Sequence, residues 1–489
     1  MKYLLSLLGC LLMIEVSAQD FGNLPTIPRQ DLLNDLELLY QGLDQFHSGM
    51  YWYTPKDSVD AAFQEVRNQL TRDMNVMEFY RLMAPLVGLS REDHADISLS
   101  SETIEMVGKE AAYFPYTVVF LGKRLFLVRD GSDEGLGLTG QEVKSINGFT
   151  PVELVEKIGN LFASDGYIKA VKYSDLEGFS FARYHYYYYG KAGQFEIQLK
   201  GDPKVYVVKA LKRDVISQNL SARSKKRNAE VSKESLEFNL IGDSIAYLGI
   251  HSFGNGDIRE NKINDNYQKF LGDAFATIAS RGIKTLIIDV GENGGGTEGN
   301  ENLLYSYLAP NYRKYLKVRA KAQKVVLDNG TDQPVKLKTF GFLEKTFFNR
   351  KMPDGSYERK HNAGHGLMAF KKTPANRFDG KLYVIISPVT YSGGSEFSNM
   401  VYTNKRGVFV GQETGGGFYG NTSGYGRDLT LPHSKITVEL PALQFMMNVE
   451  GLPFGRGVIP HHKVIPTFDQ YVKGENAALE FILQLEKRE

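Results

Sequence analysis

The sequence predicts the α/β fold class, in the form of a multi-domain α+β chain, and three observations support this. The chain has 489 residues, too many for one ordinary domain, and its 42% hydrophobic and 12% aromatic residues can form a sizeable core. Apolar residues near the N-terminus repeat at helical spacing, and short strand-like runs follow them. After residue 239, strand-like and helix-like runs alternate, as they do in an α/β core.

The first residues are typical of a secretory signal peptide, which we predict to span 1–18. Lys2 gives a positive start, and residues 4–14 form an apolar stretch that is too short to cross a bilayer. Residues 16–18 (Val-Ser-Ala) are a small-residue cleavage site. We therefore expect an exported protein, either periplasmic or secreted.

Cys10 supports a rival interpretation, in which it is the lipidated cysteine of a lipoprotein signal. We disfavour it because the apolar residues 11–14 would then remain on the mature chain. Cys10 is the only cysteine, so a mature chain that begins at Gln19 has no disulfide and no thiol nucleophile. An exported chain without disulfides suits a bacterial envelope.

Charge and hydropathy exclude several kinds of partner. Lys plus Arg (58) nearly balances Asp plus Glu (57), which gives no electrostatic reason to expect nucleic acid or an acidic membrane. After the signal, no segment is apolar over the length that a membrane span needs. The sequence does not indicate an oligomeric state.

Two regions precede the α/β core. We predict an N-terminal helical region at 19–105, because apolar residues within 28–90 repeat at helical spacing. We predict a β-rich module at 106–215, with short strands such as 117–120 and 124–128.

Two segments near the end of this module have alternative interpretations. The aromatic run 184–189 (Tyr-His-Tyr-Tyr-Tyr-Tyr) is predicted to be a strand packed on one face, with the lining of a peptide groove as the alternative. Residues 212–233 are polar and basic, and we interpret them as a solvated linker rather than a binding patch. The linker between the domains is set at 216–238.

The third region, residues 239–489, is predicted to be the α/β core. Strands are expected at 285–289 and 382–386, and a helix is expected at 267–279, before the first of these strands. Residues about 318–376 interrupt the alternation and are predicted to be an insertion, for which a flap over a cleft is one interpretation.

Ser392 is the candidate nucleophile. It follows the predicted strand 382–386, and Gly393 and Gly394 come directly after it. A serine at a strand-to-helix turn exposes its hydroxyl, and glycines let a substrate carbonyl approach backbone N–H groups. Taken alone, the segment fits an ordinary Gly-Gly loop with a capping serine slightly better.

Acyl transfer also needs N–H donors for the oxyanion. Residues 289–296 (Asp-Val-Gly-Glu-Asn-Gly-Gly-Gly) follow a predicted buried strand. We predict that Gly295 and Gly393 supply the two backbone donors. A cluster of glycines is more often only a turn, so this segment is weak evidence by itself.

Several short motifs occur in a fixed order along the chain. They are 140–148 (Gly-Gln-Glu-Val-Lys-Ser-Ile-Asn-Gly), 289–296, 390–396 (Thr-Tyr-Ser-Gly-Gly-Ser-Glu), 411–416 (Gly-Gln-Glu-Thr-Gly-Gly), 431–434 (Leu-Pro-His-Ser) and 457–460 (Gly-Val-Ile-Pro). This order resembles the tail-specific, or C-terminal-processing, serine peptidase family over most of the mature chain. The resemblance implies a core like that of the Clp protease and crotonase superfamily, an N-terminal helical bundle and a PDZ-like module.

The resemblance also implies a histidine base. Many members of the family carry a lysine shortly after Thr-x-Gly, but residues 414–420 contain none. The tricorn-like branch takes its base from an Asp-Gly-His-like segment, and residues 91–95 (Arg-Glu-Asp-His-Ala) resemble it. His94 is therefore the predicted general base, because a neutral imidazole can accept the serine proton near pH 7. The alternative is a structural histidine.

The third catalytic member and any metal site are less defined. Glu450 lies shortly before Gly457, near the position of the glutamate in tricorn-like members, and either orients His94 or is a surface carboxylate. His461 and His462 have no third ligand at a sensible spacing. We therefore expect no metal and no cofactor.

The predicted function is that of an exported serine endopeptidase or C-terminal-processing peptidase, which hydrolyses peptide bonds through an acyl-enzyme. The resemblance implies that C-terminal tails of peptides or proteins are its substrates, and that the PDZ-like module binds them as an added strand. The chain departs from the family pattern at Gly291, Asp93 and Ala95. An inactive binding protein on the same fold is therefore one alternative, and a crotonase-type thioester enzyme, in which a PDZ-like module has no use, is another.

Overall fold

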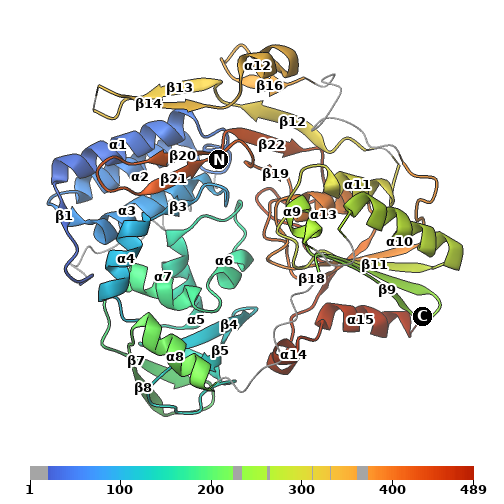
Figure 1. The fold of residues 1–489 in the computed structure, drawn as a ribbon, viewed down its shortest axis with the longest axis horizontal. Coiled ribbons are helices and arrows are strands. Elements are labelled where there is room, and N and C mark those ends of the chain that lie inside the picture. The colour runs from blue at the N-terminus through green and yellow to red at the C-terminus, as the bar shows by residue number, and fades with distance from the viewer. Residues whose placement is uncertain are drawn as a thin grey trace, which may run out of the picture.

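The computed structural model describes residues 20–223, 234–260, 265–310, 312–330, 332–360 and 373–488. The predicted signal peptide, including Cys10, lies outside these residues. Within them, no helix combines the length and the apolar character that crossing a membrane requires. Figure 1 shows the N-terminal helices and an antiparallel sheet on one side of the molecule and a mixed sheet on the other.

The mixed sheet has six strands in the order β23-β18-β17-β11-β10-β9. All neighbours pair in parallel except β9, which pairs antiparallel with β10 at one edge. The strands are β9 (Leu236–Ile241), β10 (Ile245–Ile250), β11 (Thr285–Asp289), β17 (Lys381–Ile386), β18 (Val408–Gly411) and β23 (His462–Lys463). The predicted strands at 285–289 and 382–386 are thus confirmed, side by side at the centre of the sheet.

Helices cover both faces of this sheet, so the middle residues of its central strands are mostly apolar. Side chains alternate between the faces along a strand. In β17, Tyr383 packs with Ile482 of α15 (Ala477–Glu486), whereas Val384 packs in the opposite cluster with Phe275 of α10 (Tyr267–Arg281). The same opposite cluster contains Met400 of α13 (Gly393–Thr403). The predicted α/β core is therefore present.

The N-terminal region is helical, as predicted. Its helices are α1 (Arg29–Gln45), α2 (Lys56–Gln69), α3 (Val76–Val87) and α4 (Ser101–Glu110). Asn75 begins α3 with a capping box, in which its side chain accepts the N–H of Glu78 and the Glu78 carboxylate accepts the N–H of Asn75. The apolar spacing and this cap explain why the segment folds locally as a helix.

An antiparallel sheet of five strands follows, in the chain order β4 to β8. Its strands are β4 (Tyr116–Leu121), β5 (Arg124–Asp130), β6 (Glu142–Ile146), β7 (Gln194–Leu199) and β8 (Val205–Lys209). After β6 the chain turns at Asn147 (φ 50°) and Gly148 (φ 81°) and enters α5 (Pro151–Ile158). Two consecutive residues with positive φ explain the Asn-Gly pair.

The aromatic run 184–189 is a helix, not the predicted strand. It belongs to α7 (Ser180–Tyr189), where Phe181, His185 and Tyr186 are buried at helical spacing. The run has aromatic residues at nearly every position, so period 2 and period 3.6 describe it equally well. The predicted linker also differs, because α8 (Arg213–Arg223) occupies its first part and residues 224–233 lie outside the described chain.

The hairpin β20 (Arg427–Thr430) and β21 (Thr437–Leu440) joins the C-terminal half to the N-terminal helices. Its turn is held by Asp35 of α1, whose carboxylate accepts the N–H of His433 at 3.2 Å and of Ser434 at 2.7 Å. Leu429 and Leu440 of the hairpin share one hydrophobic cluster with α1. The N-terminal region and the core are therefore packed together.

The predicted insertion at 318–376 has secondary structure of its own. It contributes β12 (Tyr315–Ala320), β13 (Lys324–Leu327), β14 (Val335–Lys338), α12 (Phe342–Phe348), β15 (Asn349–Lys351) and β16 (Tyr357–Arg359), and residues 361–372 lie outside the described chain. β12 pairs with β22 (Leu443–Met447), and the β13–β14 hairpin lies along α1 (Figure 1). The insertion thus connects the core to the N-terminal helices.

Candidate active site

Ser392 stands at the N-terminal end of α13, after the loop that follows β17. Its backbone has φ 45° and ψ −120°, a region that residues with side chains rarely adopt. The structure shows no capping hydrogen bond from its side chain, so the capping-serine alternative is wrong. A strained serine with a half-exposed side chain at a strand-to-helix turn is instead compatible with the predicted role of a nucleophile.

The glycine loop after β11 lies directly against Ser392. Because β11 and β17 are parallel neighbours, the loops that follow them meet at the same edge of the sheet. A Cβ atom added to Gly295 would lie 2.6 Å from Cβ and 3.0 Å from Oγ of Ser392. The N–H of Tyr391 donates to the carbonyl of Asn293 at 2.9 Å and joins the two loops. The structure therefore brings Ser392, Gly295 and Gly393 together.

The N–H of Gly295 is not free to bind an oxyanion, so this part of the prediction is wrong. It donates to Oδ1 of Asn293 at 2.8 Å. Gly295 serves the site through its missing side chain, which lets the loop approach Ser392. The N–H of Gly393, by contrast, donates to no other described residue, and it is the first amide of α13, where the helix dipole favours negative charge.

His94 lies in the short loop between α3 and β3 (Ile97–Ser98). Arg91 starts this loop in a left-handed conformation (φ 52°), and the N–H of Ala95 donates to the carbonyl of Glu92 at 3.0 Å. The Glu92 carboxylate is fully buried, and its Oε2 accepts the N–H and the hydroxyl of Thr422, at 2.8 and 3.0 Å. These bonds fix the loop of His94 against the C-terminal half of the chain.

The imidazole of His94 is near the nucleophile segment. Its ring centre lies 6.4 Å from that of Tyr391, the residue before Ser392. Among the described residues, no hydrogen bond joins the side chains of His94 and Ser392, and Nδ1 of His94 is buried without a partner. Catalytic hydrogen bonds are often long before substrate binds.

Asp165 joins three segments at this point. Its carboxylate accepts the N–H of Asp93 at 3.0 Å and the N–H of Gly417 at 2.9 Å. Its own N–H donates to the hydroxyl of Tyr391 at 3.3 Å. Burial raises the pKa of Asp165, while the nearby His94 lowers it. Asp165, Glu92 and His94 each offer an atom within 4.8 Å of the others.

Glu450 is not part of this cluster, so its predicted role in orienting His94 is not supported. Its N–H donates to Oγ1 of Thr403 at 2.8 Å, and its side chain is exposed. Thr403 is the last residue of α13, whereas Ser392 precedes the first, and a helix of 11 residues is about 16 Å long. Glu450 therefore lies at the opposite end of the helix, where it is a surface carboxylate.

Two further motifs, 411–416 and 457–460, lie beside the nucleophile loop. The N–H of Gly415 donates to the carbonyl of Thr390 at 3.1 Å, and Oγ1 of Thr414 accepts the N–H of Val458 at 2.9 Å. Segments 390–396, 411–416 and 457–460 therefore contact one another. Together with 289–296, these segments form a cluster in space, whereas 140–148 belongs to the antiparallel sheet and 431–434 to the turn held by Asp35.

The nearby histidine pair and one departure from the family pattern have structural roles. Nδ1 of His461 accepts the N–H of Phe409 at 2.9 Å, and its ring stacks on Tyr402. At Gly291, where the sequence departs from the family pattern, the N–H donates to Oδ1 of Asp289 at 2.8 Å.

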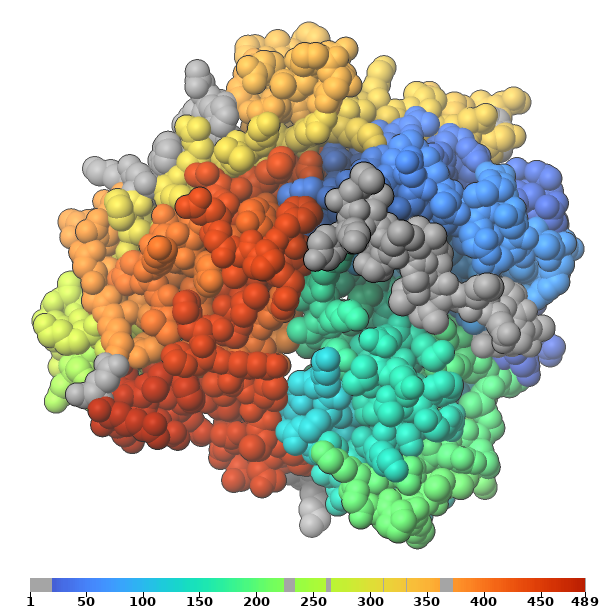
Figure 2. Space-filling model, turned by 180° about the vertical axis from the view of Figure 1, so that it is seen from behind, coloured from blue at the N-terminus to red at the C-terminus, as the bar shows by residue number. Residues whose placement is uncertain are grey.

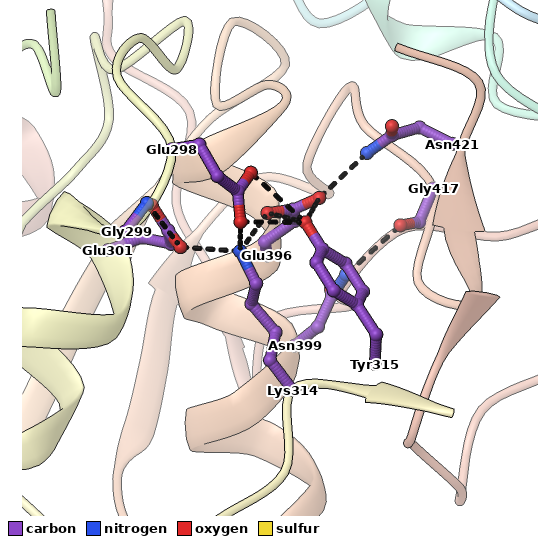
Figure 3. Close-up of polar contacts among 9 residues, drawn as sticks. All are labelled: Glu298, Gly299, Glu301, Lys314, Tyr315, Glu396, Asn399, Gly417 and Asn421. Atoms are coloured by element: carbon purple, nitrogen blue, oxygen red, sulfur yellow. Dashed lines mark hydrogen bonds and ion pairs between the residues drawn. The ribbon is translucent and has the colours of Figure 1, made fainter. Parts of the chain in front are cut away.

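A second polar cluster lies beneath the first turn of α13 (Figure 3). The buried ammonium of Lys314 donates to Glu298 and Glu301, both at 2.5 Å, and to Glu396 of α13 at 3.0 Å. Tyr315 donates to Glu396 at 2.9 Å. Glu396 also accepts the side-chain amide of Asn421 at 3.1 Å, as Figure 3 shows. An ammonium thus holds three carboxylates together.

Lys314 cannot replace His94 as a base. Burial alone would lower the pKa of Lys314, but Glu301, Glu396 and Glu298 together raise it above its ordinary value. A lysine base needs the opposite shift. The absence of a lysine at 414–420 and the charge state of Lys314 both argue against a Ser–Lys mechanism.

A cleft of about 550 Å³ separates the antiparallel sheet from this edge of the mixed sheet. Phe120 of β4 lines one wall, and Gly291, Val389 and Gln412 line the other. Figure 2 shows the C-terminal segment, in red, against the cyan part of the chain. Phe468 of α14 (Phe468–Lys473) stacks on Phe126 of β5. Val389, three residues before Ser392, is exposed in the cleft wall.

Sequence reasoning missed Asp165 and Lys314. The local sequence of Asp165 (Ser-Asp-Gly) is that of a common turn, and its partners are remote along the chain. Lys314 stands among other basic residues, and only its burial distinguishes it from them. No local pattern marks either residue.

Comparison with known proteins shows that the chain is similar to peptidases. Residues 244–464 match the model of peptidase family S41. A CPAF point mutant has a similar structure, with a TM-score of 0.60 and 14% identity over 91% of this chain and 96% of that one. The structure of mature CPAF complexed with lactacystin is similar with a TM-score of 0.58 and 14% identity, over 94% of this chain and 98% of that one. At this identity the two structures show the fold alone. No curated protein sequence matches the chain.

Proposed function

We propose that this chain, whose residues 244–464 match the model of peptidase family S41, is a serine peptidase that hydrolyses peptide bonds through an acyl-enzyme. The observation that carries the proposal is the strained backbone of Ser392 (φ 45°) at the start of α13, with Gly295 packed against it. Strain of this kind persists where the surrounding structure enforces it, commonly at active sites.

In the proposed reaction, His94 accepts the proton of the Ser392 hydroxyl as Oγ attacks the peptide carbonyl. The N–H of Gly393 and the positive end of α13 stabilise the oxyanion. The imidazolium of His94 then gives its proton to the leaving amine, and an acyl-enzyme remains. Water, deprotonated by the same imidazole, attacks the ester and releases the acid.

Asp165 is the proposed positioning residue for His94. Its carboxylate is buried within the cluster of Glu92 and His94, and two backbone N–H groups fix it. A fixed carboxylate holds an imidazole in one orientation and stabilises the imidazolium that forms. The position of Glu450 beyond the far end of α13 supports Asp165 over Glu450 for this role.

We propose that the cleft between the two sheets receives the C-terminal tail of a peptide or protein. The antiparallel sheet would act as the PDZ-like module implied by the sequence. Edge strand β4 is already occupied in part, because Val118 accepts the N–H of Gly178 at 2.8 Å and the N–H of Phe120 donates to Glu177 at 3.2 Å. An added strand on β4 would displace these two contacts.

Export is proposed on the signal-like N-terminus alone. Cleavage after Ala18 gives a mature protein that begins at Gln19. N-terminal sequencing of protein from a secreting host tests this, and an intact Met1 or a lipid-modified Cys10 would contradict it.

A fluorophosphonate probe tests the proposed mechanism. Wild-type protein should be labelled once per chain, and Ser392→Ala should be neither labelled nor able to cleave unfolded protein substrates. The matched control is Ser395→Ala, since Ser395 lies in the same helix turn and donates to the Thr390 carbonyl. If only Ser395→Ala lost labelling, the nucleophile would be Ser395, and the proposed role of Ser392 would be wrong.

The second candidate function is a binding protein that has lost catalysis. The replacement of the family's usual residues at Gly291, Asp93 and Ala95 favours it. Well-folded wild-type protein that neither reacts with the probe nor cleaves peptides, but binds C-terminal peptides in the cleft, would support this candidate.

A further inference from the structure

The cluster of Glu92, His94 and Asp165 is buried and incompletely hydrogen-bonded. Glu92 is fully buried and Asp165 is 1% exposed. Oε1 of Glu92 and Nδ1 of His94 are buried without hydrogen-bond partners among the described residues. Unpaired buried acceptors are costly, so a group that pairs with them would stabilise the site.

We propose that Glu92, His94 and Asp165 bind a divalent transition-metal ion such as Zn²⁺, and that the bound ion blocks His94 as the general base. The second half of the inference rests on the proposed function, and the first half does not. The metal would therefore inhibit the peptidase rather than serve it as a cofactor.

The donor set suits such an ion. One imidazole nitrogen and two carboxylate oxygens lie within 4.8 Å of one another. Zinc binds nitrogen and oxygen ligands at about 2.0–2.2 Å, so small side-chain rotations would close the three donors around it. Imidazole favours zinc and its neighbours over magnesium or calcium. Three protein ligands leave a fourth position for water.

The second acidic cluster shows what a paired site looks like. Glu298, Glu301 and Glu396 lie equally close together, but the ammonium of Lys314 sits among them and contacts all three (Figure 3). No lysine or arginine makes an ion pair with Glu92 or Asp165 in the described part of the chain. The metal is inferred at the cluster that lacks a cation of its own.

A bound metal ion would prevent His94 from acting as a base, because it occupies the lone pair that accepts the proton. A neutral imidazole has one N–H and one nitrogen lone pair. The metal takes the lone pair, and the other nitrogen keeps its proton. No lone pair then remains to accept the proton of Ser392, whichever nitrogen the metal uses. Any proton held between the carboxylates is released to solvent as the metal binds.

Calorimetric titration of the chelator-treated full-length protein with ZnCl₂ tests the binding half. We expect one ion per chain, and cobalt in place of zinc should give visible absorption bands. The conservative variants Glu92→Gln and Asp165→Asn and the variant His94→Ala should each weaken zinc binding beyond the ~10–100-fold that losing an outer partner costs.

His462→Ala is the matched control, because His462 is an exposed histidine outside the cluster. It should bind zinc as the wild type does. Zinc binding that is unchanged by all three cluster variants, or that disappears in His462→Ala, would overturn the site. Circular dichroism of each variant separates loss of the site from loss of the fold.

An activity assay tests the inhibition half. Zinc should abolish peptide hydrolysis at the concentrations at which it binds, and a chelator should restore it. Zinc binding without inhibition would leave the metal site standing and refute His94 as the base. Hydrolysis by a wild-type protein that binds no zinc would refute the metal site and leave the proposed peptidase standing.

Discussion

Gly295 leaves no space for a side chain beside Ser392. A methyl group on Gly295 would lie 2.6 Å from Cβ of Ser392, and the residue has φ +105°. Gly295→Ala should therefore displace the nucleophile and lower peptidase activity by about 100-fold or more, the cost of a misplacement of the order of 1 Å. The measurement is kcat/KM on a peptide substrate.

Gly294→Ala is the matched control for this change. No atom lies within 4 Å of the added methyl, and Gly294 does not have a positive φ. Its activity should stay near that of the wild type. Equal losses in both variants would mean that the loop tolerates no side chain anywhere, and that its contact with Ser392 is not the cause.

Replacing Asp165 should impair catalysis, whereas replacing Glu450 should not. Asp165→Asn removes the charge beside His94, and loss of the equivalent carboxylate in serine peptidases costs up to ~10⁴-fold in kcat. Glu450→Gln changes an exposed side chain at the far end of α13 and should keep full activity. The reverse result would restore Glu450 as the third member. Comparing kcat with KM separates a loss of catalysis from a loss of binding.

His94→Ala should lower kcat by about 10²–10⁴-fold, the usual contribution of a general base. The truncated side chain leaves space beside Tyr391, so added imidazole should restore part of the activity. A purely structural histidine would show no such rescue. His462→Ala, at an exposed position, should behave as the wild type with and without imidazole.

Lys314→Met should destabilise the fold strongly. It leaves the buried carboxylates of Glu301 and Glu396 without their shared cation, and breaking a buried ion pair costs about 3–5 kcal/mol. Lys269→Met is the control, because Lys269 forms an ion pair with the exposed Asp273 and such pairs contribute about 0–1 kcal/mol. Urea unfolding measures both. Equal midpoints would contradict the role assigned to the cluster.

The same cluster predicts a pH dependence of stability. Burial raises the pKa of Glu298 from 4.5 to about 8, although the charge of Lys314 lowers it. The charges of Glu396 and Glu301 add to the increase. The folded state thus holds a proton that the unfolded state has lost, so this contribution to stability is full below pH 4.5 and disappears as the pH rises through 8. Unfolding at pH 6 and pH 9 should show the decrease, and Glu298→Gln should reduce it.

Much of the fold could be predicted because its signals are local. The strands β11 and β17 are apolar on both faces and bounded by polar loops, and α3 has both helical spacing and a cap. α7 could not be predicted in the same way, since aromatic residues at nearly every position hide the period. Its helical state is set by packing, such as that of His185 on Phe195.

The candidate site was predictable only where motifs carry it. Ser392 and Gly393 lie in a recognisable turn, and the structure brings Gly295 to them. Asp165 lies 226 residues before its partner Tyr391, and no spacing rule reaches so far. Glu450 was misjudged because a position relative to a motif gives no direction in space.

The hydrogen bond between Asp35 and the N–H of Ser434 has a consequence for when the protein can become active. The proposed base, His94, is synthesised early and the proposed nucleophile, Ser392, late. The hydrogen bond of Asp35 and the packing of the β20–β21 hairpin join the two halves of the chain that carry them. A nascent or half-translocated polypeptide therefore has an incomplete reaction centre. Proteolysis would begin only once the finished chain has closed, so neighbouring proteins are spared while the enzyme is being made.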